Sequence, residues 1–121
     1  MGSEMCIRDR RGAAHFAAGL EALRAHPLVG DARHRGLLGA LELVSDKASK
    51  RGFDAALGLS DRIFATGYRN GLVFRSFGDH ILGFAPALTF TEDEFAQMFV
   101  RLRKTLDEVL QAPDVRAALA G

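Results

Sequence analysis

Residues 71–91 read Gly-Leu-Val-Phe-Arg-Ser-Phe-Gly-Asp-His-Ile-Leu-Gly-Phe-Ala-Pro-Ala-Leu-Thr-Phe-Thr, and the other predicted elements are arranged around them. Two short apolar runs, residues 72–76 and 81–84, contain the residue types that favour β-strands. The Gly-Asp pair at 78–79 lies between them and is typical of a hairpin turn, because both residue types tolerate turn geometry. The stretch therefore predicts a β-hairpin.

A long amphipathic helix is expected directly after this hairpin. Thr91 and Glu94 have the spacing of a capping box, in which each side chain accepts a hydrogen bond from the other residue's backbone N–H. Apolar residues then recur every three or four positions, as on one face of a helix: Phe95, Met98, Phe99, Leu102, Leu106, Val109 and Leu110. The helix is expected to stop before Pro113, with a short helical tail over 114–119.

The part of the chain before residue 71 predicts two more helices and further strands. In chain order the expected elements are a helix over 11–26, an extended segment over 28–45, a polar loop over 46–54 and a helix over 55–69. The extended segment is largely apolar on both faces, which is typical of a covered or central strand. Together these elements predict an α+β fold, a two-layer sandwich with helices on one face of a mainly antiparallel sheet.

Residues 1–10, Met-Gly-Ser-Glu-Met-Cys-Ile-Arg-Asp-Arg, do not share the pattern of the remaining chain. They show no usable periodicity and resemble translated adapter sequence. We interpret them as a non-native or artefactual leader, which makes 11–121 the domain proper. On this interpretation Arg11 is not a natural beginning.

The composition is that of an ordinary globular chain. Of its 121 residues, 48% are hydrophobic and 26% are charged, and the formal net charge is +1. A charge so close to neutral gives no indication of nucleic acid or an anionic membrane surface as partner. The single cysteine, Cys6, excludes an internal disulfide and is compatible with a reducing cytosol, so a cytoplasmic location is expected.

The residues that carry chemistry in other proteins are sparse here. No glycine-rich phosphate loop and no Gly-x-Ser-x-Gly nucleophile motif is present. The four histidines, at 15, 26, 34 and 80, lack metal-ligand spacing to one another or to Cys6. The sequence itself therefore predicts no catalytic, cofactor-binding or metal-binding residue in this chain.

Arginines provide the two candidate anion sites. Arg75 lies in an apolar run, so its strand face is expected to be part-buried, and a part-buried guanidinium needs an anionic partner. Asp79, across the predicted hairpin, could be that partner. Plain exposure and a ligand-binding role are the alternatives. The Arg-His-Arg cluster at 33–35 could also hold an anion, although a solvated turn between two strands is the favoured interpretation.

Several segments, in this order and at this spacing, resemble the C-terminal small domain of the class III pyridoxal-phosphate-dependent aminotransferases. The matching segments are Val29-Gly30-Asp31-Ala32-Arg33, Arg35-Gly36-Leu37-Leu38, Glu42-Leu43-Val44, Gly71-Leu72-Val73-Phe74-Arg75, Gly78-Asp79, Ala85-Pro86 and Thr91. The resemblance covers about residues 11–111 and is closest to the ω-amino-acid:pyruvate and amine:pyruvate branch. It implies the small domain of a fold type I enzyme, which is a homodimer with active sites at the subunit interface.

The resemblance also implies where the functional groups lie. In that family the cofactor lysine, the pyridine-nitrogen aspartate and the phosphate-binding loop belong to a preceding large domain, so pyridoxal 5'-phosphate would be bound mainly there. Lys47, Lys50 and Lys104 match none of those positions. Arg75 does match one, the arginine that binds the substrate carboxylate and swings away to admit an uncharged amine. The implied reaction is ping-pong transamination from an amine or ω-amino acid to a keto acid such as pyruvate.

One departure and two alternatives remain at this point. The family often has two prolines where this chain has Pro86-Ala87, which puts the geometry of that loop in question. A related mutase or decarboxylase could use the same small domain. A free-standing α+β binding module, with Arg75 docking an acidic ligand, is the alternative outside the enzyme class.

Overall fold

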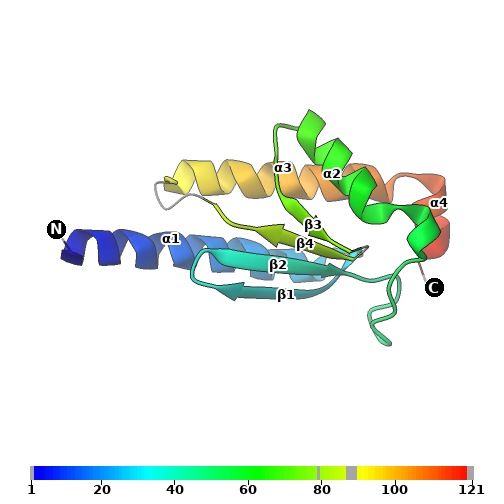
Figure 1. Ribbon diagram of the computed structural model, residues 1–121, viewed down its shortest axis with the longest axis horizontal. Helices are drawn as coiled ribbons and strands as arrows, with labels where there is room; N and C mark the ends of the chain where they lie inside the picture. Colours follow the sequence, from blue (N-terminus) through cyan, green and yellow to red (C-terminus); the bar gives the residue numbers. More distant parts are fainter. Residues whose placement is uncertain (1, 79, 87–89, 120–121) are drawn as a thin grey trace.

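The computed structural model describes residues 2–78, 80–86 and 90–119, of which 2–9 are described by their backbone alone. In chain order the elements are α1 (Gly2–Ala22), η1 (Leu23–Ala25), β1 (Val29–Arg35), β2 (Leu38–Leu43), η2 (Ala55–Leu57), α2 (Leu59–Arg69), β3 (Arg75–Phe77), β4 (Ile81–Phe84), α3 (Glu92–Leu110) and α4 (Pro113–Ala118), as drawn in Figure 1.

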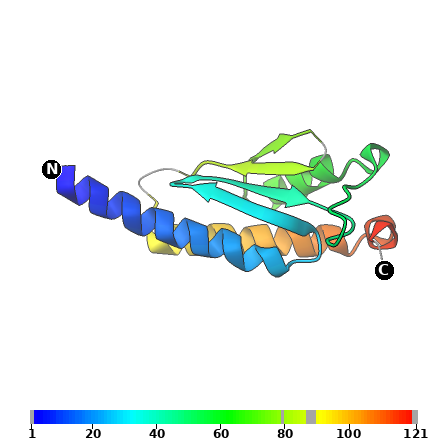
Figure 2. The ribbon, with the colours of Figure 1, turned by 90° about the horizontal axis from the view of Figure 1, so that it is seen from below.

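The four strands form one antiparallel sheet in the order β1-β2-β4-β3. Figure 2 shows α1 and α3 lying side by side along one face of this sheet. The shorter α2 packs against α3 and beside β3. This arrangement confirms the expected α+β fold with helices on one face of an antiparallel sheet.

Strand alternation gives the sheet two different faces. Residues paired along the inner face, such as Leu41 with Leu82, are buried against the helices. Residues on the opposite, outer face are open, and Leu38 is 65% exposed there. The stretch 28–45 therefore forms a hairpin, and its second strand, β2, is a central strand of the sheet. The described residues do not cover the outer face of this hairpin.

One hydrophobic core connects the sheet to all the long helices. Phe16 of α1 is fully buried and lies near Phe95 and Phe99 of α3, with ring centroids 6.3 and 6.0 Å away. It reaches the sheet at Gly39, where an added Cβ would lie 2.6 Å from the Phe16 ring. The absence of a side chain at Gly39 thus allows α1 to pack closely on β2.

The capping box predicted before α3 is confirmed. The Thr91 hydroxyl oxygen accepts a hydrogen bond from the Glu94 N–H at 3.2 Å, and Glu94 Oε1 accepts one from the Thr91 N–H at 3.2 Å. The helix ends at Leu110, before Pro113, as expected. Ala87, the position that departs from the family pattern, lies outside the described residues.

Several predicted boundaries were wrong. The first helix begins at Gly2 rather than Arg11, and the third strand begins at Arg75 rather than Leu72. The cluster at 33–35 lies in β1, not in a turn, and the turn instead follows at Gly36, where φ is 58°.

No helix among the described residues is long and apolar enough to span a bilayer.

The buried side chain of His26, directly after η1, contacts α3. His26 Nε2 lies 2.8 Å from Asp107 Oδ1, and the Leu28 N–H donates to His26 Nδ1 at 3.2 Å. Since Nδ1 accepts, the neutral ring carries its proton on Nε2 and donates it to Asp107. Burial lowers the pKa of His26, and the nearby charges of Arg103 and Lys47 lower it further, against the opposing effect of Asp107.

This histidine predicts a pH dependence of stability. Its pKa in the folded chain is below the unfolded value of about 6.5, so the unfolded state binds more protons as the pH falls. The contribution of His26 to the free energy of unfolding is therefore constant above about pH 6.5 and falls as the pH drops below that value. Between pH 8 and pH 5.5, the free energy of unfolding measured with urea should fall less in His26→Gln than in the parent. Equal losses in the two proteins would contradict this assignment.

Candidate functional site

The outer face of the sheet contains an apolar hollow of about 340 Å³ at the ends of β2, β3 and β4. It is lined by Leu38, Gly39, Val73, Phe74, Arg75, Phe77, Gly83, Phe84 and Ala85. Arg75 is the only charged residue among these. A single guanidinium on an apolar surface is suited to an anion that also carries an apolar group.

Arg75 is placed by the ladder between β3 and β4, where it pairs with Gly83. Its side chain is exposed, so the expectation of a part-buried strand face was wrong for this chain. The reason is that the helices cover only the other face of the sheet. Within the described residues Arg75 makes no hydrogen bond or ion pair, and Asp79, its expected partner, lies outside them.

Phe77 forms the aromatic wall of the hollow beside Arg75. The two residues are two positions apart on β3 and therefore share a face. An added Cβ at Gly83 would lie 2.5 Å from the Phe77 ring, so this glycine allows the ring to lie across β4. The ring stays 53% exposed. Sequence reasoning did not identify Phe77 as part of the site, although the i, i+2 alternation with Arg75 was a usable signal.

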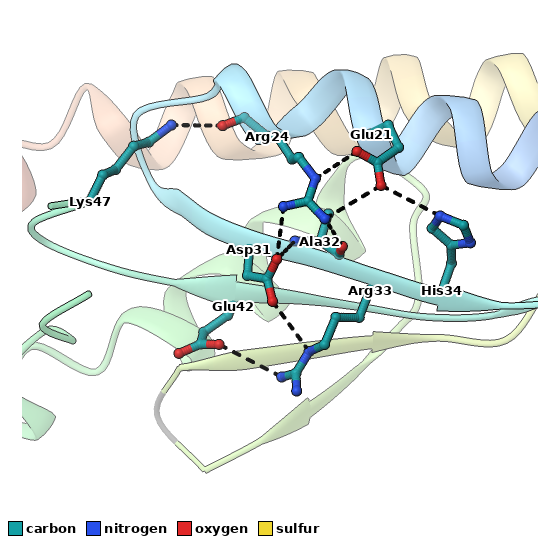
Figure 3. Close-up of polar contacts among 8 residues, drawn as sticks. All are labelled: Glu21, Arg24, Asp31, Ala32, Arg33, His34, Glu42 and Lys47. Atoms are coloured by element: carbon teal, nitrogen blue, oxygen red, sulfur yellow. Dashed lines mark hydrogen bonds and ion pairs between the residues drawn. The ribbon is translucent and has the colours of Figure 1, made fainter. Parts of the chain in front are cut away.

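The second candidate, Arg33, lies on the same cross-strand row as Arg75. The row runs Arg33–Ala40–Gly83–Arg75 through three successive pairings. Figure 3 shows that Arg33 lies between two carboxylates, with Nε 3.7 Å from Asp31 and Nη2 3.7 Å from Glu42. These negative charges oppose the binding of another anion. Of the two candidate cations, Arg75 is therefore the better placed to bind one.

The remaining residues of the predicted cluster do not extend this site. His34 Nε2 lies 3.5 Å from Glu21 Oε1, on the side of the sheet that faces α1. Arg35 ends β1 and is exposed. The described residues contain no group of three or more side chains that could hold a metal ion.

The described lysines do not form a cofactor site. Lys47 Nζ donates to the backbone carbonyl of Arg24 at 2.7 Å, and Lys104 lies 3.9 Å from Glu108. Lys50 lies in the loop after Asp46, with a positive φ of 58°. None of the three lines the hollow that contains Arg75. None of the described lysines is therefore placed to hold pyridoxal phosphate at this hollow.

The family model for class-III aminotransferases matches residues 3–106 of this chain. The diaminobutyrate–2-oxoglutarate transaminase of Halomonas elongata is 38% identical over 93 residues, which are 75% of this chain and 20% of that protein. The putrescine–pyruvate aminotransferase of Pseudomonas aeruginosa is 36% identical over 93 residues, covering 76% of this chain and 20% of that protein.

Solved structures show the same relationship. The PMP-bound aminotransferase of Vibrio fluvialis superposes with a TM-score of 0.83 at 35% identity, covering 99% of this chain and 25% of that one. The chain thus spans about a fifth of the curated relatives it matches. The family match, sequence identity and fold agree. The chain belongs to the class-III aminotransferase family.

Proposed function

We propose that this chain is the small domain of a pyridoxal-phosphate-dependent transaminase that moves an amino group from an amine or ω-amino acid to a keto acid such as pyruvate. In this proposal Arg75 binds the substrate carboxylate. The observation that carries it is the position of Arg75, the one charged residue among the described residues that line an apolar hollow on the open face of the sheet. Family membership supports the reaction class.

The binding step follows from the chemistry of arginine. A guanidinium presents two parallel N–H groups that match the two oxygens of a carboxylate, which gives a charge-assisted pair of defined orientation. The apolar side chains of Phe77 and Val73 would flank that pair and contact an apolar part of the same substrate. Because Arg75 is exposed on the open face of the sheet, its long side chain can also turn toward solvent when the bound amine has no carboxylate.

The cofactor would be held outside this chain. Pyridoxal phosphate supplies an electron sink for amino transfer when it is bound. No lysine of this chain that the structure describes lines the hollow, so we assign cofactor binding to the remainder of a longer enzyme. The PMP-bound state of the Vibrio fluvialis relative is consistent with this assignment.

The same proposal includes the organisation of the protein. Residues 11–121 are assigned to the small domain and 1–10 to a leader, although the leader continues α1 as one helix. We further propose a cytoplasmic homodimer. The names of the two curated relatives differ in their keto acid, 2-oxoglutarate in one and pyruvate in the other, so both acceptors belong in the assay.

Two measurements test this proposal. The purified 121-residue chain mixed with pyridoxal phosphate should show no stoichiometric absorbance band of a lysine adduct, and such a band would contradict the assignment of the cofactor to another part of the enzyme. The full-length enzyme, supplied with a diamine and either keto acid, should form the corresponding amino acid. Loss of carbon dioxide, or migration of the amino group within one substrate, would instead indicate a decarboxylase or mutase.

A further inference from the structure

The first strand, β1, forms an edge of the sheet. In an antiparallel sheet, successive residues of a strand direct both backbone groups alternately toward the partner strand and away from it. On an edge strand the outward groups are unpaired and provide a template for another strand. The way in which β1 uses its outward groups therefore determines whether this edge can bind one.

Both backbone groups of Ala32, in the middle of β1, are occupied by side chains. The Ala32 N–H donates to Asp31 Oδ1 at 3.0 Å, and the Ala32 carbonyl oxygen accepts from Arg24 Nη2 at 2.6 Å. Arg24 Nη1 also donates to the same Asp31 oxygen at 2.8 Å. Arg24 and Asp31 thus occupy the two positions that a neighbouring strand would use, as Figure 3 shows.

This arrangement is held from both sides. Arg24 Nε donates to Glu21 Oε2 at 2.6 Å, which fixes the guanidinium against the end of the first helix. Lys47 Nζ donates to the backbone carbonyl of Arg24. The arginine is therefore positioned by its backbone and by both ends of its guanidinium. We call the pair Arg24 and Asp31, with the two Ala32 groups that they bind, the edge cap.

The partner that this edge fits best is β1 of a second copy, because its charges are self-complementary. If two β1 strands pair antiparallel with Ala32 opposite Ala32, then Asp31 of each copy is opposite Arg33 of the other. Opposite charges in directly facing positions stabilise such pairs. In that register Ala32 lies on the two-fold axis and would supply the central hydrogen bonds. Those are the groups that the edge cap occupies.

We propose that the edge cap keeps the β1 edge closed to strand addition by a second copy of this chain. The cap satisfies the central backbone groups and engages Asp31, so both the hydrogen bonds and the charge pairs of the self-complementary register are blocked. His34 is the next residue of β1 whose backbone groups point away from β2, as those of Ala32 do. None of the described side chains bonds to its backbone groups, so among the described residues the side-chain closure of these two positions lies at Ala32.

The test compares the self-association of the 121-residue chain and its variants by sedimentation. Arg24→Met frees the Ala32 carbonyl and leaves Asp31 without its arginine partner, so it should lower the dissociation constant for dimer formation at least tenfold relative to the parent. Arg62→Met is the matched control, because it removes another exposed arginine–carboxylate pair, with Asp114, away from this edge. It should leave the dissociation constant at the parent value. An Arg24→Met protein that associates no more tightly than the parent would overturn the proposal.

A second change shows whether the new contact uses β1. In the register above, the His34 N–H points to the other copy, so adding His34→Pro to Arg24→Met removes that donor without removing a bond to β2. The double variant should return to the association of the parent. Persistent dimerisation would place the contact elsewhere and overturn the proposal.

Amide exchange in the parent gives a measurement that does not depend on a variant folding. The Ala32 amide is bonded within the edge cap, whereas no described side chain accepts from the His34 amide. Ala32 should therefore exchange more slowly than His34. Equal exchange at the two positions would mean that the cap does not persist in solution and would overturn the proposal.

Discussion

Replacing Arg75 by alanine in the full-length enzyme should lower kcat/KM for a keto-acid acceptor by roughly 30- to 150-fold. Removal of a charge-assisted pair costs on the order of 2–3 kcal/mol, and each 1.4 kcal/mol is a factor of ten. An uncharged amine donor makes no such pair, so its kcat/KM should change far less. Half-reaction kinetics with pyruvate and with a simple amine measure the two effects separately.

The arginine on the opposite edge strand, Arg33, offers a matched control for this experiment. Arg33 lies on the same cross-strand row as Arg75, but Asp31 and Glu42 already lie 3.7 Å from its guanidinium. Arg33→Ala should therefore leave keto-acid turnover within a few-fold of the parent. If Arg75→Ala reduced both half-reactions equally, Arg75 would have no role in carboxylate recognition and the proposed site would have to be abandoned.

Phe16→Ala should lower the free energy of unfolding of the chain by about 3–5 kcal/mol, the usual cost of truncating a buried phenylalanine. Its ring is fully buried between α3 and the sheet and lies under Gly39. Truncation leaves a void between α1, α3 and the sheet, and close packing prevents these elements from filling it. Urea unfolding followed by circular dichroism measures the change.

Phe64→Ala serves as the comparison. This ring lies on α2, is 40% exposed and lies edge-on to Phe74 of the core, at a centroid distance of 5.8 Å. Phe64→Ala should lower the free energy of unfolding far less than Phe16→Ala does, because truncation at the part-exposed position gives up less buried apolar area. Similar losses at the two positions would show that the contact between α1 and the sheet contributes little to stability.

The elements predicted correctly are those whose signals are local. The capping box of Thr91 and Glu94, the apolar stripe of α3 and the strand at 81–84 each depend on residues within a few positions of one another. Backbone geometry at such short range is set by the residues themselves. The family resemblance, carried by the order of these segments, is confirmed by the match over residues 3–106.

The incorrect predictions concern properties that depend on tertiary contacts. Leu72 and Phe74 are buried, so the apolar run 72–76 resembled a complete strand, yet only Arg75 and Ser76 of that run join the ladder. Exposure of Arg75 depends on which face the helices cover, and no local pattern contains that information. The role of Arg75 in carboxylate binding and the boundary at residue 11 stay predictions.

The row from Arg33 to Arg75 also bears on how this family could change its substrate range. Of the two residues between the arginines, Gly83 lines the hollow and has no side chain, so the hollow is bounded there by the backbone of β4. Any larger residue at position 83 would displace the Phe77 ring, which an added Cβ would approach to 2.5 Å. The size of the hollow could therefore evolve through position 83 alone, with Arg75 and its strand left intact.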